Sequence, residues 1–270
     1  MSFALGMPTL IELPDLAANV DVCRRLGLAF VELNMNLPAF CPENLDPMDI
    51  KRVSAESGVG FTVHLPEELD LASFHPPIRE GHIRRCEQAI DWAGRAGAAL
   101  VNMHLNPGVY FTLPGGKAWI YDRHSDRFLS LLSEAISRLL DLAAVNGVML
   151  AIENTGCFDL QFMANAIDRL SALDGFCLTW DVGHDAESGY NDRDTITRHI
   201  DKVRHFHLHD SDGKSSHQVL MTGIVDVSGT LDLARRIGAG VVIETKTVDA
   251  LSESVEAIRG LTSAHPQVCP

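Results

Sequence analysis

Acidic and imidazole side chains recur along the chain at the ends of short apolar segments. Six of them lie five to seven residues after a glycine, and His207 ends a similar segment. Carboxylates and imidazoles bind divalent transition-metal ions and transfer protons as general acids and bases. If these side chains converge, they predict a metal-dependent site for proton transfer. The six residues are Glu32, His64, His104, Glu153, Asp181 and Glu244.

The glycines that precede these residues mark a repeated unit that would bring them together. Each glycine lies where a helix C-cap needs a positive φ, and an apolar strand candidate follows directly. Amphipathic helical patterns fill the intervals, as in residues 128–142. With further strand candidates at 3–8 and 203–209, eight strand–helix units favour an α/β fold, a closed (β/α)8 TIM barrel forming a single domain over residues 1–270. The glycines are Gly27, Gly58, Gly97, Gly147, Gly175 and Gly238.

The strand patterns also indicate where the ionisable residues point. Side chains alternate along a strand, so Val31 and Leu33 share one face while Glu32 and Asn34 share the other. The apolar face must pack against helices, which turns the ionisable face into the barrel and its last residue toward the C-terminal mouth, where active sites of this fold lie. An open, doubly wound sheet is the alternative, but neither GxGxxG nor GxxxxGK(S/T) follows the first strand candidate.

Carboxylates and imidazoles gathered in one barrel mouth need compensation for their charge. Removing an unpaired charge from water is costly, and a divalent cation relieves that cost. A buried salt-bridge network without a metal is the alternative, but few lysines or arginines fall on the inward face. The mixed donor set suits Mn²⁺, Zn²⁺, Co²⁺ or Fe²⁺ better than Ca²⁺, and Mg²⁺ is also a candidate. A divalent metal is therefore the expected cofactor.

The composition indicates a folded, acidic protein. Hydrophobic residues make up 46% of the chain and charged residues 21%, which permits a large core. The net charge of −14 repels phosphate backbones and makes nucleic acid an unexpected partner. No leader-like segment and no apolar run of membrane length is apparent, so a cytoplasmic location without membrane association is expected. The cysteines form no CxxC pair and are expected to be buried free thiols: Cys23, Cys41, Cys86, Cys157, Cys177 and Cys269.

Seven short motifs, in order along nearly the whole chain, resemble the xylose isomerase-like TIM barrels, also called the AP endonuclease 2 family. That family includes sugar isomerases, ketose 3-epimerases, inosose dehydratases and endonuclease IV. The motifs are Val-Glu-Leu at 31–33, His64, Asn-Met-His at 102–104, Ile-Glu-Asn-Thr at 152–155, Asp-Val-Gly-His at 181–184, His-Leu-His-Asp at 207–210 and Ile-Glu-Thr at 243–245.

The resemblance implies a single metal held by side chains from strands five to eight, as in the isomerase and epimerase members. Two of the ligands, Glu153 and Glu244, would act as base and acid on a small sugar or sugar-like hydroxycarbonyl substrate, through a metal-stabilised enediolate. The implied metal ligands are Glu153, Asp181, His207 and Glu244.

The resemblance also implies substrate contacts, with one departure from the pattern. Asp159 and His184 fall where ketose epimerases place residues that bind substrate. The arginine that those epimerases carry six residues after the metal histidine is replaced by Gly213, with Lys214 next. This departure argues against a ketose 3-epimerase in particular.

Other members of the family offer alternative functions. A lyase of the inosose dehydratase kind would share the same site. In endonuclease IV, extra histidines bind further zinc ions, and His64 and His104 match two of them, so they could form a second metal site with Glu153. The aspartate paired with another zinc-binding histidine is absent from the segment 215–217, and the usual Gly-Glu-Gly reads Met-Thr-Gly at 221–223. A metal-binding barrel without catalysis is the non-enzymatic alternative.

The remaining candidates are expected to bind substrate, each with an alternative. Glu32, with Asn34 on the same face, binds substrate or forms a hydrogen bond within the barrel. His209 contacts substrate or caps a loop, and Lys246 binds a substrate phosphate or lies in solvent. His217 is a further substrate-binding candidate. His205 lies deeper in its strand, which favours a core histidine over a ligand.

The segment 106–124 is the longest connection between strand and helix candidates. It carries aromatic residues around a Pro-Gly-Gly sequence on the expected catalytic side. Such a loop is expected to act as a lid that excludes water from the site, with a contact between subunits of a homo-oligomer as the alternative. His75, His82 and His124 follow no strand and are expected at the surface.

Overall fold

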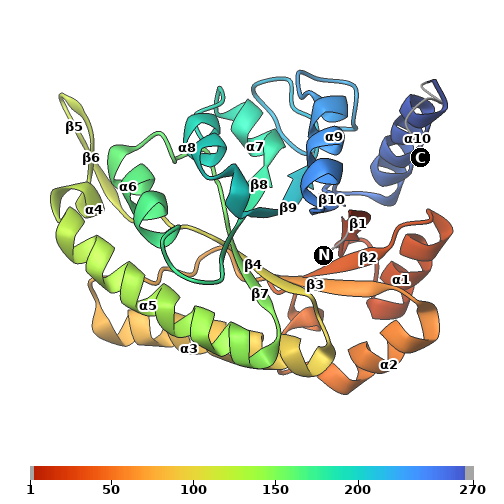
Figure 1. Cartoon of the computed structure of the whole chain (residues 1–270), viewed down its shortest axis with the longest axis horizontal. Helices are drawn as coiled ribbons and strands as arrows, with labels where there is room; N and C mark the ends of the chain where they lie inside the picture. Colours follow the sequence, from red (N-terminus) through yellow and green to blue (C-terminus); the bar gives the residue numbers. More distant parts are fainter. Residues whose placement is uncertain (1–2, 265–270) are drawn as a thin grey trace.

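Eight short strands close into a parallel barrel in the computed structural model, which describes residues 3–264. Neighbouring strands follow the order β1-β10-β9-β8-β7-β4-β3-β2, and the last pairs with the first (Figure 1). The predicted (β/α)8 barrel is therefore confirmed. The barrel strands are β1 (Ala4–Pro8), β2 (Phe30–Asn34), β3 (Gly60–His64), β4 (Leu100–His104), β7 (Met149–Glu153), β8 (Phe176–Asp181), β9 (Val203–Leu208) and β10 (Gly240–Ile243).

Helices follow the strands and cover the outside of the barrel. Among them, α3 and α5 pack side by side along one flank (Figure 1). The helices are α1 (Leu16–Arg25), α2 (Pro47–Ser57), α3 (Pro76–Ala96), α4 (Ile120–Arg123), α5 (Ser125–Asn146), α6 (Gln161–Leu170), α7 (Val182–Glu187), α8 (Arg193–Arg198), α9 (Val227–Ile237) and α10 (Val248–Ala264), with short 3-10 turns η1 (Pro38–Phe40) and η2 (Ile200–Lys202).

Glycines end most of the long helices, as their positions indicate. Gly58, Gly97, Gly147 and Gly238 are left-handed C-cap residues, a conformation that costs little without a Cβ atom. Gly175 differs from the prediction. Helix α6 ends at Leu170, and Gly175 lies in the turn that leads into β8, where its φ of 78° reverses the chain.

The two faces of each strand separate as the alternation predicts. The outward side chains, such as Val31, Leu150 and Phe206, are buried in the main core between sheet and helices. Inside the barrel, Leu100, Ala151 and Cys177 form a small separate apolar cluster. Between this cluster and the C-terminal mouth, the inward-facing side chains are polar, and they include the predicted metal ligands.

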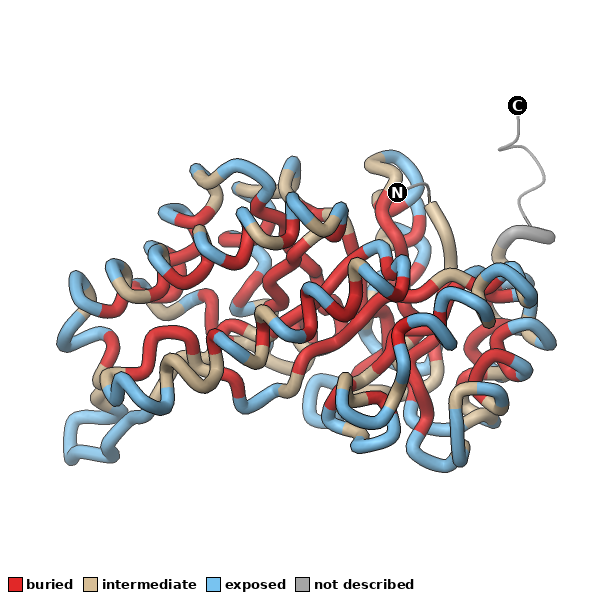
Figure 2. The backbone as a smooth tube through the Cα atoms, turned by 90° about the horizontal axis from the view of Figure 1, so that it is seen from below, coloured by how far each residue is buried: buried red, intermediate tan, exposed pale blue. Residues whose placement is uncertain are grey.

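An antiparallel hairpin interrupts the connection between β4 and α5, for which the sequence predicts a long aromatic loop. Strand β5 (Tyr110–Leu113) pairs with β6 (Gly116–Trp119), and β5 is exposed along its length. Trp119 packs toward Phe162 on α6, and the tip extends beyond the barrel (Figures 1 and 2). Among the described residues, no hydrogen bond, ion pair or ring contact joins this hairpin to the ionisable residues of the mouth.

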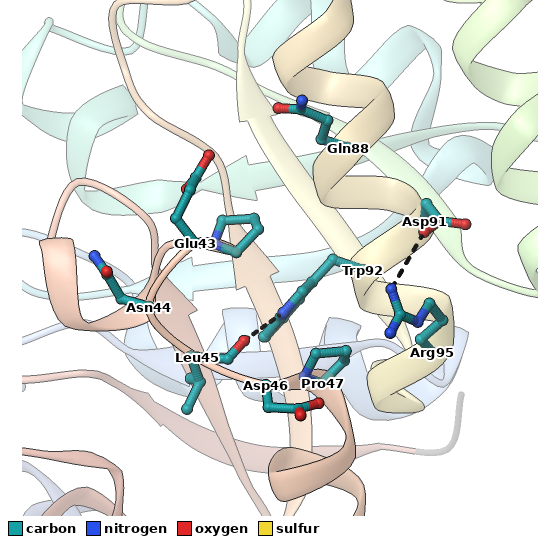
Figure 3. Close-up of a pocket in the computed structure, with 10 residues that line it drawn as sticks. Glu43, Asn44, Leu45, Asp46, Pro47, Gln88, Asp91, Trp92 and Arg95 are labelled. Atoms are coloured by element: carbon teal, nitrogen blue, oxygen red, sulfur yellow. Dashed lines mark hydrogen bonds and ion pairs between the residues drawn. The ribbon is translucent and has the colours of Figure 1, made fainter.

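A surface cavity of about 580 Å³ lies outside the barrel, between the segment 42–47 and α3. Its lining includes Glu43, Asp91 and Arg95, while Trp92 donates a hydrogen bond from Nε1 to the carbonyl of Leu45 (Figure 3). None of the residues predicted to bind metal or substrate lines this cavity.

No helix among the described residues is both long and apolar enough to span a bilayer.

The described cysteines are free thiols, and all but Cys41 are buried. Burial raises the pKa of Cys23 and of Cys86 to about 12, which suppresses the reactive thiolate. Cys269 lies outside the described residues.

In a Cys269→Ser background at pH 8, we expect a chromogenic disulfide reagent to modify Cys41 in the native protein and all the described thiols after unfolding. Rapid native labelling of Cys23 or Cys86 would contradict this placement.

Candidate metal centre

Four predicted ligands come together at the C-terminal mouth of the barrel. Glu153 and Asp181 end β7 and β8, His207 is the last inward-facing residue of β9, and Glu244 follows β10 directly. One ligand atom from each lies within 4.8 Å of all the others. His207 Nδ1 is 2.9 Å from Glu153 Oε1, 3.0 Å from Glu244 Oε2 and 3.8 Å from Asp181 Oδ2.

His207 supplies a direct test of whether these residues fit a metal ion. Its side chain is 1% exposed, yet neither ring nitrogen makes an aligned hydrogen bond. A buried polar atom left without a partner costs about 1–3 kcal/mol. Ligand atoms that share a divalent ion at about 2.1 Å from its centre lie roughly 3 Å from one another. The spacings from Nδ1 to Glu153 and Glu244 match this value, and Asp181 lies within 4 Å, so the donor set and its geometry fit a divalent cation.

In the absence of a cation, protons on histidines offset the carboxylates. Burial opposes the ionisation of Glu153, but the charges of His207 and His104 hold the pKa of that carboxyl well below its usual value. Burial also opposes the charging of His207, but the surrounding glutamates raise the pKa of its imidazole well above the usual value. Because a metal and a proton compete for Nδ1, metal binding at this centre should release protons.

Asp181 is fixed by its surroundings so that one carboxylate oxygen remains directed at the centre. Oδ1 caps α7 by accepting the backbone N–H of His184 at 2.7 Å, and His209 Nε2 lies 3.1 Å from Oδ1 and 3.3 Å from Oδ2. The backbone of Asp181 is held in turn by Asn154, whose Oδ1 accepts the Asp181 N–H and whose Nδ2 donates to the Asp181 carbonyl. Oδ2 is the oxygen that faces His207.

Gly183 allows His209 to reach Asp181. A Cβ atom at this position would lie 2.0 Å from Cε1 of the His209 ring. The backbone N–H of His217 donates to His209 Nδ1, which leaves the proton on Nε2 for the hydrogen bond to Asp181. His209 therefore contacts a predicted metal ligand, with both of its ring nitrogens engaged.

Replacing Gly183 with alanine is therefore expected to displace the His209 ring. Overpacking of this kind lowers the free energy of unfolding by about 1–3 kcal/mol, and we expect metal affinity to fall as well. Gly81 in α3 is a matched control, since nothing lies within 4 Å of its Cβ position. Calorimetry and metal titration of both alanine variants check the prediction. Equal behaviour of the two variants would rule out the proposed clash.

A second group of ligand atoms surrounds the other oxygen of Glu153. His64 Nε2 lies 3.2 Å and His104 Nε2 3.5 Å from Glu153 Oε2, and Asn102 Nδ2 donates to the same oxygen. His64 Nδ1 is 2.7 Å from the carbonyl of Leu65, so it donates there and leaves Nε2 directed at Glu153. Burial opposes the charging of His64, but Glu153 raises the pKa of its imidazole to about 9.

A third group consists of histidines at the rim. His184 Nδ1 lies 3.4 Å from Glu187, and His217 Nδ1 lies 3.1 Å from the carbonyl of Glu244. At His217 the carbonyl accepts from Nδ1, so the neutral ring carries no proton on Nε2, whereas His184 Nε2 lies 3.8 Å from Asp181 Oδ2. His217 adopts a positive φ of 58°, and burial lowers the pKa of its imidazole to about 4. Together with His209, these rings could gather around a cation, but both nitrogens of His209 already have partners.

The other predicted substrate-binding residues occupy different depths. Asp159 is exposed, and Lys246 Nζ forms an ion pair of 2.9 Å with Glu244 Oε1. Asn34 is half-buried, and its Oδ1 accepts the backbone N–H of Asn36 in the following turn. Glu32 is only 2% exposed and contacts His205 and His207 inside the barrel.

Two buried aspartates that shape the mouth were not anticipated. Asp192 accepts hydrogen bonds from the backbone N–H groups of Gly156 and Phe158 and from Asn154. Asp210 accepts the N–H groups of Ser211, Thr222, Gly223 and Val225. Asp210 belongs to the His-Leu-His-Asp motif, whereas no feature of the sequence around Asp192 distinguishes it from a surface residue.

Solved structures that resemble the chain share its barrel. A D-tagatose 3-epimerase-like protein is 18% identical over 100% of both chains, with a TM-score of 0.79. L-Ribulose 3-epimerase is 17% identical over 100% of both chains, with a TM-score of 0.73. An IOLI protein with a bound zinc atom is 14% identical over 97% of each chain, with a TM-score of 0.72. At sequence identities this low, the structural similarity shows a shared fold and nothing more specific.

Sequence comparisons identify the family. A search of curated proteins gives no significant match. The signature of one family matches residues 20–262, which covers the barrel from α1 to α10. The chain belongs to the xylose isomerase-like TIM barrel family.

Proposed function

We propose that this protein is a divalent-metal-dependent isomerase or epimerase of a small sugar or sugar-like hydroxycarbonyl compound. The observation that carries the proposal is the buried, unpartnered Nδ1 of His207, surrounded by three carboxylates at the barrel mouth. The names of the solved epimerases that share the fold support the same reaction class. Mn²⁺, Zn²⁺, Co²⁺ and Mg²⁺ are the candidate metals, and the zinc atom in the related IOLI protein favours a transition-metal ion.

The proposed reaction needs a proton to be removed beside a carbonyl group and returned. Glu153, Asp181, His207 and Glu244 would hold the cation, which when bound stabilises negative charge on substrate oxygens. Glu153 and Glu244 carry carboxyls with lowered pKa values, so both are ionised at neutral pH and able to accept a proton. One glutamate takes the proton from carbon to give an enediolate form of the substrate, the other takes a proton from solvent water and passes it to carbon, and the first then releases its proton to solvent.

The rim residues would bind and orient the substrate. His184 and His217 turn Nδ1 toward Glu187 and the Glu244 carbonyl, which leaves Nε2 as the nitrogen that would form hydrogen bonds with substrate hydroxyl groups. Asp159 is exposed beside β7 and would accept another. Lys246 helps to keep Glu244 ionised through its ion pair and would also attract an anionic substrate. Lys214 is exposed in the loop that lacks the arginine of ketose epimerases.

A second cation between His64, His104 and Glu153 is a further part of the proposal. The supporting observation is that Leu65 fixes the His64 proton on Nδ1, so that a neutral His64 would direct a lone pair at Glu153 Oε2. Two acceptors 3.2 Å apart repel each other unless a proton or a cation lies between them. In this arrangement Glu153 would bridge two ions.

The decisive experiment measures proton exchange rather than a single product. Metal-analysed protein is incubated in D₂O with a panel of ketoses, aldoses and inososes. Deuterium incorporation beside the carbonyl, with an isomeric product, supports the proposal. Loss of water from an inosose would identify a lyase instead, and cleavage of abasic-site DNA with added zinc would identify a nuclease. Metal binding without turnover of any substrate would favour a non-catalytic barrel.

A further inference from the structure

Glu32 lies deeper in the barrel than the proposed metal centre, on the opposite side of the His207 ring. Its Oε1 is 2.7 Å from His207 Nε2, while His207 Nδ1 faces the carboxylates of the mouth. Glu32 is 2% exposed, and its carboxylate contacts Thr62, His205 and His207 inside the barrel. The contact with His207 is therefore the route by which Glu32 can influence the centre.

The Glu32 carboxylate is held in a fixed orientation by residues of two other strands. Its Oε2 accepts a hydrogen bond of 3.0 Å from Thr62 Oγ1 on β3 and lies 3.0 Å from His205 Nε2 on β9. Thr62 is the register partner of Glu32 in the β2–β3 pair, so the first bond follows from the strand pairing itself. With Oε2 occupied, Oε1 is the oxygen left for His207.

An imidazole can bind a metal through only the nitrogen that carries no proton. Hydrogen bonding at the second ring nitrogen selects the tautomer and orients the ring, and this control often comes from a carboxylate. At His207 the short contact to Glu32 is not aligned as a hydrogen bond, so it acts as a charge contact that stabilises a proton on Nε2, while a cation among the carboxylates around Nδ1 would exclude a proton from that nitrogen. This tautomer frees Nδ1, which points at the other ligands.

We propose that Glu32 is a positioning residue for His207, and that it keeps the proton of the imidazole on Nε2 so that Nδ1 is the metal ligand. The inference rests on the proposed function, because it assumes a cation at the four-residue centre. Thr62 and His205 act one step further away by fixing the direction of the Glu32 carboxylate. A merely structural role would instead make Glu32 important for the fold and indifferent to metal affinity.

The test compares Co²⁺ binding by the wild type, Glu32→Gln and Thr62→Val proteins, followed by visible absorption and calorimetry. We expect Glu32→Gln to weaken Co²⁺ binding by about 10–100-fold and to change the Co²⁺ absorption spectrum. Thr62→Val, which leaves the carboxylate in place but removes one donor, should give a smaller loss in the same direction. Glu43→Gln, at an exposed glutamate outside the barrel, is the matched control and should bind as the wild type does.

The possible failures are distinguishable. If the wild type binds Co²⁺ but Glu32→Gln and Thr62→Val bind it with unchanged affinity and spectrum, the positioning role is wrong and the metal centre stands. If the wild type binds no Co²⁺, or binds it equally after His207→Ala, the metal centre itself is wrong. Should Glu32→Gln not fold, unchanged Co²⁺ affinity in Thr62→Val still overturns the inference.

Discussion

Substitution of Glu153 or Glu244 by glutamine is expected to slow substrate proton exchange by about 10³-fold, the middle of the range measured for general acid–base catalysis. Glutamine keeps the size of the side chain and an oxygen ligand, but it cannot accept the substrate proton. The two residues face the same point from β7 and from the end of β10, each about 3 Å from His207 Nδ1. Loss of either should therefore interrupt the same reaction, at different proton-transfer steps.

Measurement of deuterium exchange at saturating metal separates this effect from a loss of the cofactor. Glu256→Gln, at an exposed position of α10, provides a control for removing one negative charge. Metal content is determined for each variant in the same preparation. Retention of wild-type exchange rates in both Glu153→Gln and Glu244→Gln would eliminate these glutamates as the acid and base.

Removal of the metal is expected to abolish turnover and to destabilise the fold. The unfolded chain cannot hold the four ligands together, so an ion present at a thousand times its dissociation constant stabilises the folded state by about 4 kcal/mol. For a domain of this size such a change shifts the melting temperature by roughly 10 °C. The carboxylates must then be offset by protons, as the raised pKa of the His207 imidazole indicates.

Calorimetry of chelated and reconstituted protein checks this prediction directly. The His207→Ala variant serves as a comparison, because it should melt at nearly the same temperature with and without metal. Proton release during titration provides a second readout, since the metal displaces the proton from His207. Identical melting of chelated and metal-loaded wild type would show that no ion is bound at the centre.

The barrel was predictable because one local rule is repeated along the chain. Apolar residues such as Val31 and Ile152 alternate with ionisable ones, and the glycines at 58, 97, 147 and 238 end helices just before strands. Gly175 has the same positive φ but serves a turn, because a left-handed residue is needed wherever the chain reverses sharply. Pattern alone does not separate these two uses.

Convergence of the proposed ligands was predictable, but their depth was not. The ends of parallel strands meet at one mouth, which brings Glu153, Asp181 and His207 together whatever the details of packing. Depth depends on the stagger between strands and on side-chain length, which no single strand encodes. The sequence therefore left Glu32 open between a substrate contact and a hydrogen bond within the barrel, and its carboxylate lies among His205, His207 and Thr62.

Residues that organise loops were the hardest to anticipate. Asp192 and Asp210 act by accepting several backbone N–H groups, and those groups come from segments distant in sequence. No periodicity marks such a residue, because its role follows from how two loops cross. The exposed hairpin β5–β6 was missed because each of its strands has only four residues, Tyr-Phe-Thr-Leu and Gly-Lys-Ala-Trp, and neither shows a clear alternation of polar and apolar side chains.

The strands of the hairpin β5–β6 pair with each other and with no strand of the barrel. Its length can therefore change without shifting the register of β4 or β7, which pair directly with each other beneath it. A segment of this kind tolerates insertions. Residues 113–116 at its tip are thus a suitable point for attaching a fluorophore or an affinity tag while the barrel remains intact.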